Sequence, residues 1–178
     1  MPRKHRKHRT TKSGFTLIEL LLAMIMLMVG LLGSALLITS AIAANNRTKL
    51  DSSGTMLAEM VIDTVSANTA GTAQTLTDCN PAGGVNWPVN TAAGGATLVA
   101  ATGAIDFNSQ AYAAVPAGYA MRYVTCGAAG QQSTYDVRWN VQAFAGGRLI
   151  TVAARQMATT NQGRWFTQPI TLRQVTMK

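Results

Sequence analysis

Residues Lys12–Ala44 read KSGFTLIELLLAMIMLMVGLLGSALLITSAIAA, and this stretch decides the fold of the 178-residue chain. After Lys12 its single charged residue is Glu19, and no charged residue occurs from Leu20 to Asn46. About 20 consecutive apolar residues are enough to cross a bilayer as a helix. The stretch therefore predicts a transmembrane helix over residues 15–44.

A short basic segment precedes this apolar stretch. It holds six of the fifteen Lys and Arg residues, namely Arg3, Lys4, Arg6, Lys7, Arg9 and Lys12. The rest of the chain has nine basic and seven acidic residues, a balance of +2. Most of the formal net charge of +8 therefore lies in the basic segment. Basic residues hold their end of a transmembrane helix in the cytoplasm. The chain from Asn45 onward is then expected to face the periplasm or the exterior.

Two other targeting segments compete with this interpretation. A secretory signal peptide has a shorter apolar region and ends in a small-residue cleavage site. The late site available here is formed by Ala41, Ala43 and Ala44, after an unusually long apolar run. A plain signal anchor is the other alternative.

Residues 45–70 predict an amphipathic continuation of the same helix. Leu50, Leu57, Val61 and Val65 fall near one stripe, while charged residues are available for other faces. A single glycine, Gly54, weakens a helix without ending it. We expect one helix from Phe15 to about Ala67, ending near Asn68–Gly71.

Residues 71–178 predict a small β-rich head. The first part, 72–118, is rich in Gly, Ala, Thr, Asn and Pro and predicts loops with short strands. Alternating side chains predict strands over Tyr119–Cys126 and Thr134–Phe144. In the second strand, one face carries Tyr135, Val137, Trp139 and Val141, and the other carries Asp136, Arg138, Asn140 and Gln142.

The C-terminal part predicts a hairpin and a last strand. Gly146-Gly147 precedes RLITVAARQ, which indicates a hairpin. The last candidate strand is Trp165–Val175, with Pro169 marking an edge or a break. We expect the stripe with Leu57 and Val61 to cover the apolar face of this antiparallel sheet, which makes the fold class α+β.

Cys79 and Cys126 are the only two cysteines, and both follow the apolar segment. In an oxidising compartment two such cysteines indicate one disulfide. Two free buried thiols are the alternative.

The composition argues against an enzyme. Both histidines, His5 and His8, lie in the basic segment, so its removal would leave no histidine for a catalytic triad. Glu59 and Asp63 lie four residues apart on a helix, where such pairs are usually solvated. No cofactor or metal is expected. Nucleic-acid binding through Trp87, Trp139 or Trp165 is not expected, because the body is nearly neutral.

The register of Gly14, Phe15 and Glu19 after the basic run resembles the type IV prepilin processing motif. The resemblance implies an α+β type IV pilin-like fold, a leader over 1–14, cleavage by a prepilin peptidase between Gly14 and Phe15, and methylation of the Phe15 amine. It also implies that Glu19 takes part in subunit assembly by pairing with the Phe15 amine of a neighbouring subunit. An ionised side chain within a membrane is costly unless it is paired. A glutamate at the membrane edge is the alternative interpretation.

The apolar helix also indicates a subclass. Gly30 and Gly33 let helices approach closely in a bundle. Many major pilins have a proline at the position of Leu36, and this chain departs from that pattern. The run AMIMLMVGLLG, which holds Met24, Met26 and Met28, looks most like the minor pilins of the PilV-type pilus modification group.

The expected function is therefore that of a minor pilin in the assembly or modification of a type IV pilus, a class of filament linked to cell adhesion. The expected partners are the prepilin peptidase, other pilins through the N-terminal helix, and the inner membrane before assembly. A minor pseudopilin of a type II secretion system and a DNA-binding competence pilin are the alternatives. The expected location is the inner membrane, with a cytoplasmic N-terminus, and then the pilus, periplasm or cell surface.

The first prediction is cleavage after Gly14. N-terminal sequencing of the mature protein should begin at Phe15, with a methylated amine, because the motif directs the cut to the cytoplasmic edge of the apolar helix. A mature protein that begins at Met1 or at Asn45 would contradict the prepilin interpretation.

Overall fold

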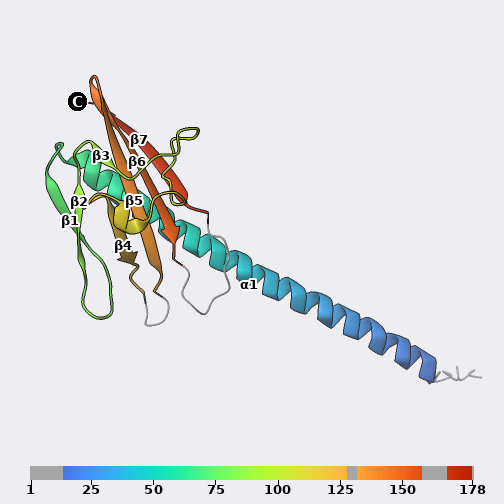
Figure 1. The fold of residues 1–178 in the computed structure, drawn as a ribbon. Helices are drawn as coiled ribbons and strands as arrows, with labels where there is room; N and C mark the ends of the chain where they lie inside the picture. The colour runs from blue at the N-terminus through green and yellow to red at the C-terminus, as the bar shows by residue number, and fades with distance from the viewer. Residues whose placement is uncertain (1–13, 128–131, 158–167, 178) are drawn as a thin grey trace, which may run out of the picture. The chain divides into compact units, whose positions relative to one another are not determined.

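The computed structural model describes residues 14–127, 132–157 and 168–177. In chain order the elements are one long helix, three short strands, a 3-10 turn, a further short strand and three longer strands (Figure 1). Helix α1 spans Leu17–Ala67 and begins two residues later than expected. The chain divides into two compact units, residues 1–46 and 47–178, which are described separately below.

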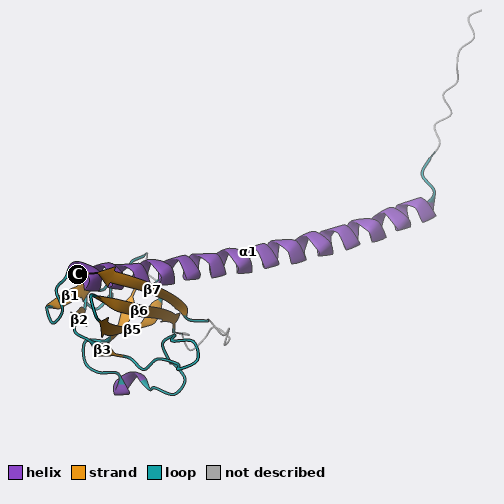
Figure 2. Cartoon of the chain, turned by 90° about the horizontal axis from the view of Figure 1, so that it is seen from above, coloured by secondary structure: helices purple, strands orange, loops and turns teal. Residues whose placement is uncertain are grey.

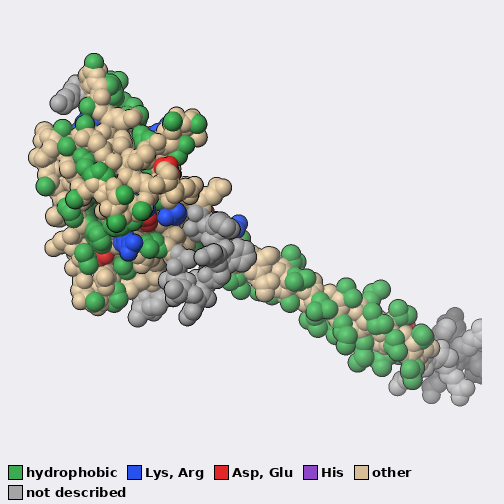
Figure 3. Space-filling view, in the orientation of Figure 1, with side chains coloured by type: hydrophobic (Ala, Val, Ile, Leu, Met, Phe, Trp, Pro, Cys, Tyr) green, Lys and Arg blue, Asp and Glu red, His purple; other side chains and the backbone are tan. Residues whose placement is uncertain are grey.

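The N-terminal unit is helical from Leu17, and none of its described residues is buried within the protein. Every residue from Gly14 to Asn46 is exposed, including the large apolar ones. The side chains on its visible face are almost all hydrophobic (Figure 3). Among the described residues, α1 is the one helix that is long and apolar enough to cross a membrane. This length and composition are consistent with a membrane anchor.

The second unit contains a five-stranded antiparallel sheet. Strands β5 (Thr134–Phe144), β6 (Gly147–Gln156) and β7 (Ile170–Met177) follow one another as neighbours. On the other side of β5 lie β4 (Ala120–Val124) and the two-residue β3 (Gly94–Gly95). Strands β1 (Ala73–Thr77) and β2 (Asn86–Asn90) form a separate antiparallel pair. A long apolar helix with a small antiparallel sheet confirms the expected α+β class at this level.

The strand predictions agree closely with these bounds. The β5–β6 hairpin closes with Phe144 opposite Gly147, and Gly146 takes a φ of 89°, a conformation that glycine adopts readily. The interval 72–118 contains β1, β2, β3 and the 3-10 turn η1 (Tyr112–Ala114), as short strands and loops predict. Pro169 lies just before β7, so the last strand begins at Ile170. The first residues predicted for it, 165–167, lie outside the described residues.

The C-terminal part of α1 covers one face of the sheet (Figure 2). The alternation in β5 places its apolar residues on this face, and cross-strand partners in β6 and β7 extend it. The helix buries the predicted Leu57, Val61 and Val65 against this core. The cluster of buried apolar side chains supplies the main driving force for folding of this unit. Its largest fully buried members in the five-stranded sheet are Trp139, Tyr135, Met121, Ile150, Val137, Val141 and Val152.

Gly54 lets the helix lie close to the sheet. A Cβ atom there would lie 2.9 Å from Cδ1 of Ile170 and 3.5 Å from Cε1 of Tyr135. The Tyr135 hydroxyl donates a 2.9 Å hydrogen bond to the Leu50 carbonyl oxygen of the same helix. Gly54 weakens the helix taken by itself, but it allows the helix to pack closely against the sheet.

The end of α1 is held by a buried arginine from the sheet. Arg148 donates from Nη2 to the Asn68 carbonyl oxygen at 2.9 Å and from Nη1 to the Thr91 carbonyl oxygen at 3.4 Å. A cation at a helix C-terminus interacts favourably with the free carbonyl groups there. Arg148 thus joins the helix end, β6 and the segment after β2.

The opposite face of the sheet is covered by the long connection between β3 and β4. This segment passes below the sheet in Figure 2 and includes η1. As a result the polar residues Asp136 and Arg138 of β5, on the side away from the helix, are also buried, with 4% and 2% exposure. Alternation correctly predicted their direction, but it does not indicate that a further layer covers them.

Cys79 and Cys126 form a disulfide, with 5.0 Å between their Cα atoms. The bridge joins the chain after β1 to the chain after β4. The predicted pairing is confirmed, and no described cysteine is free.

Asp78, the residue before the bridge, is buried and accepts four hydrogen bonds. Its donors are the backbone N–H groups of Val85, Asn80 and Val124, at 2.7, 3.2 and 3.4 Å, and Nε1 of Trp87, at 3.2 Å. Burial by itself raises the pKa of a carboxyl group, but these donors outweigh it and hold the pKa of Asp78 below its usual value. The carboxylate therefore contributes stability above its unfolded-state pKa, and this contribution is lost as pH falls through the lower folded-state value.

Reduction of the disulfide should lower the melting temperature of the head. The two cysteines are separated by 47 positions in the sequence, and closing a loop of this size stabilises the folded state by roughly 4 kcal/mol through the lost entropy of the unfolded chain. This free energy corresponds to about 10–20 °C in melting temperature. The measurement is a thermal melt of the unreduced full chain in detergent, with and without reductant. The Cys79→Ser/Cys126→Ser double variant is the control and should not respond to reductant. Free thiols in the unreduced protein would contradict the bridge.

Candidate functional site

The N-terminal motif lies at the start of α1. Gly14 and Phe15 precede the first helical residue, and Phe15 is 83% exposed. Apart from its chain neighbours, no atom of the described residues lies within 4 Å of the position a Gly14 Cβ would take. The Gly14–Phe15 peptide bond thus lies between two exposed residues just before the helix.

Glu19 lies in the first turn of α1, next to a cap that the sequence analysis did not identify. The backbone N–H of Glu19 lies 3.1 Å from the Thr16 carbonyl oxygen and 3.4 Å from Thr16 Oγ1. Thr16 therefore acts as an N-cap, and Glu19 stands at the third helical position. The pattern Thr-x-x-Glu before an apolar run is a capping signature that would have predicted this role. A negative charge in the first turn is also favoured by the helix dipole.

Two other groups considered from sequence have ordinary positions. Glu59 and Asp63 are exposed on the helix face away from the core. Trp139 is fully buried, and its Nε1 donates to the Asn90 carbonyl oxygen at 3.0 Å, so it serves packing. Trp165 lies outside the described residues. Among those that are described, no group of three or more His, Cys, Asp or Glu could hold a metal ion.

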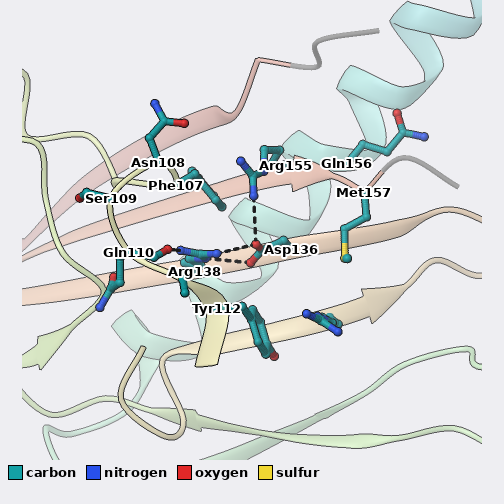
Figure 4. A pocket seen from close by; sticks show the side chains of 12 residues that line it. Phe107, Asn108, Ser109, Gln110, Tyr112, Asp136, Arg138, Arg155, Gln156 and Met157 are labelled. Atoms are coloured by element: carbon teal, nitrogen blue, oxygen red, sulfur yellow. Dashed lines mark hydrogen bonds and ion pairs between the residues drawn. The ribbon is translucent and has the colours of Figure 1, made fainter. Parts of the chain in front are cut away.

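A polar pocket of about 540 Å³ lies on the sheet face away from the helix, and we call it the arginine pocket (Figure 4). Its floor is a cross-strand row in which Arg122 of β4 and Arg155 of β6 flank Asp136 of β5. The wall comes from the segment between β3 and β4, through residues 107–112. The antiparallel register alone brings these three charged residues together.

Asp136 and Arg138 form a buried bidentate ion pair at the centre of the pocket. Arg138 donates from Nε to Oδ1 at 3.0 Å and from Nη2 to Oδ2 at 2.8 Å. Its Nη1 also donates to the Gln110 carbonyl oxygen at 2.7 Å, which fixes the wall to the floor. Arg155 adds a single longer contact of 3.5 Å to Asp136. Both oxygens of the carboxylate are therefore occupied.

Two aromatic rings order the three guanidinium groups (Figure 4). Phe107 lies 4.7 Å from the guanidinium carbon of Arg138 and 4.5 Å from that of Arg155. Tyr112 lies 4.5 Å from the guanidinium of Arg122 and 5.9 Å from that of Arg138. Arginine over the face of a ring is attracted by its quadrupole, most strongly where water is partly excluded.

The environment of the pocket shifts the pKa of the Tyr112 hydroxyl upward. Burial is the main cause and the negative charge of Asp136 adds to it, while the nearby arginines act in the opposite direction. Tyr112 is therefore neutral at physiological pH and acts as a hydrogen-bonding and stacking group, not as a base.

The described residues thus offer two candidate sites, the start of α1 in the first unit and the arginine pocket in the second. No model of a known protein family, no curated protein and no solved structure matches this chain. Sequence reasoning predicted the disulfide, which the structure contains, and proposed roles for Gly14, Phe15 and Glu19 that stay predictions, but it did not predict the arginine pocket. The alternation in β5 placed Asp136 and Arg138 on one face, whereas nothing in the chain indicates that Phe107 and Tyr112 cover them.

Substitution of Arg138 by Gln should destabilise the head by about 3 kcal/mol, because Asp136 would remain buried without its bidentate partner. The matched control is Arg122→Gln, which removes the same charge from an exposed side chain and should change stability by less than about 0.5 kcal/mol. The measurement is a near-UV circular dichroism melt of the full chain in detergent. Equal melting temperatures for the two variants would show that the buried pair has no structural role.

Proposed function

We propose that the chain is a minor pilin-like subunit that inserts into a type IV pilus through its N-terminal helix. The observation that carries the proposal is the surface of residues 17–44. This surface is apolar on all sides and has a single charge, Glu19. A helix of this kind needs a bilayer or other helices around it. In this proposal the helix anchors the subunit, and the head lies outside the membrane.

The motif at the start of the helix supports processing at Gly14. In this proposal a prepilin peptidase removes residues 1–14 and methylates the new Phe15 amine. The cut discards six basic residues and keeps the complete apolar helix. Loss of the basic residues frees the helix end from the cytoplasmic surface, which makes the leader an assembly switch.

Glu19 then has a partner only in the assembled state. An ionised side chain among apolar helices is costly unless a positive group pairs with it. The Phe15 amine of a neighbouring subunit supplies such a group, four residues away along the mature chain. The Thr16 cap holds Glu19 in the first helical turn of its own chain, which supports a role near the helix start.

Substitution of Glu19 by Ala should allow membrane insertion but reduce incorporation into filaments severalfold. The apolarity of the helix rises while the pairing charge is lost. The measurement is the ratio of subunit in sheared filaments to subunit in membranes. Glu59→Ala is the matched control, because Glu59 is an exposed carboxylate on the same helix. Equal incorporation of the Glu19→Ala variant and the wild type would rule out the pairing role.

A further inference from the structure

We propose that the arginine pocket binds the carboxylate group of an acidic sugar. This inference concerns the head alone and does not depend on assembly into a filament. The pocket lies over β4, β5 and β6, and its volume of about 540 Å³ is within the range of small-molecule sites. It has room for one or two sugar rings.

The charges of the pocket are not balanced by the protein. All seven acidic residues of the chain are among those that the structure describes, and the two ion pairs between described residues both involve Asp136. Arg138 already satisfies both oxygens of Asp136. Arg155 has one long contact of 3.5 Å, and Arg122 has no carboxylate partner. Asp106, which directly precedes Phe107 of the wall, is a second carboxylate, and its pKa is lowered by hydrogen bonds from Ser109 and Asn108 and by the charge of Arg138. Three guanidinium groups against two carboxylates still leave an excess positive charge that an anion would neutralise.

The two rings hold these guanidinium groups in place before a ligand arrives. Arg155 rests on Phe107 at 4.5 Å, and Arg122 rests on Tyr112 at 4.5 Å. Stacking leaves the edge of a guanidinium free, and this edge carries the paired N–H donors that match a carboxylate. Because the side chains are already ordered, binding costs less conformational entropy than it would for unsupported surface arginines.

The chemistry of the wall favours a sugar over a polymer of another class. Asn108 is exposed at the pocket and offers an amide suited to hydroxyls, and Ser109, whose hydroxyl donates to Asp106, can still accept a hydrogen bond. A nucleic acid would need open ring faces for base stacking, whereas arginines stack on both rings here. A peptide would need an open strand edge or an apolar groove, whereas the pocket lies on the face of β5 between two neighbouring strands.

Titration calorimetry of the full chain in detergent tests the proposal, with trigalacturonate as the probe. Its fully methyl-esterified form has the same rings without charge and is the matched ligand control. We expect the acid to bind and the ester to bind at least about tenfold more weakly, since charge-assisted hydrogen bonds are lost.

Protein variants locate the binding. Arg122→Gln and Arg155→Gln should each weaken binding of trigalacturonate about tenfold. Arg173→Gln is the matched control, because Arg173 lies on the same sheet face but outside the pocket, and it should bind as the wild type does. A thermal melt of each variant verifies that the head is folded.

Several results would overturn the proposal. These are no binding of trigalacturonate, equal binding of acid and ester, or an equal loss in Arg122→Gln and Arg173→Gln. Displacement of trigalacturonate by inorganic phosphate at equal concentration would reduce the pocket to a general anion site. Tighter binding of a twelve-residue oligo-dT, lost in Arg122→Gln, would assign the pocket to nucleic acid instead.

Discussion

One helix has to meet two different burial requirements, and the rest of the structure depends on this constraint. Over residues 17–44 its surface is apolar on every side and is buried nowhere within the protein. Over residues 47–67 it is apolar on one stripe, and that stripe is buried against the sheet. A helix that is apolar on every side is stable only when lipid or other helices surround it. A helix with one apolar stripe needs only one hydrophobic core on that side, which the sheet provides. The change between the two occurs at Asn45–Lys49, where polar and charged residues return.

The head is stabilised by contacts that connect distant parts of the chain. The core under α1 is apolar and closely packed, and Gly54 allows the approach of Ile170. Arg148 holds the end of the helix, and the disulfide joins the segment after β1 to the segment after β4. A small head buries a limited apolar area, so these few polar and covalent links form a large share of its stability.

The two faces of the sheet serve different purposes. The face under α1 is apolar and structural. The opposite face holds a charged floor beneath a polar segment, and this segment carries the two rings that order the arginines. The buried Asp136–Arg138 pair fixes a geometry, because removal of either partner would leave the other charge buried and unpaired. Here it orients the wall of the pocket through the bond from Arg138 to the Gln110 carbonyl oxygen.

The sequence by itself determined the long helix, its division at about Asn45, the main strands of the head and the pairing of the two cysteines. These features follow from signals that the sequence shows directly. The long apolar run predicts the helix, the period-two alternation in β5 and Gly146-Gly147 predict the strands, and the count of cysteines predicts the disulfide. The arginine pocket was decided by the tertiary structure alone. Strand register aligns Arg122, Asp136 and Arg155 across three strands, and a connection without a periodic pattern brings Phe107 and Tyr112 over them. Such contacts join residues far apart in the chain, so no local pattern of residue types could predict them.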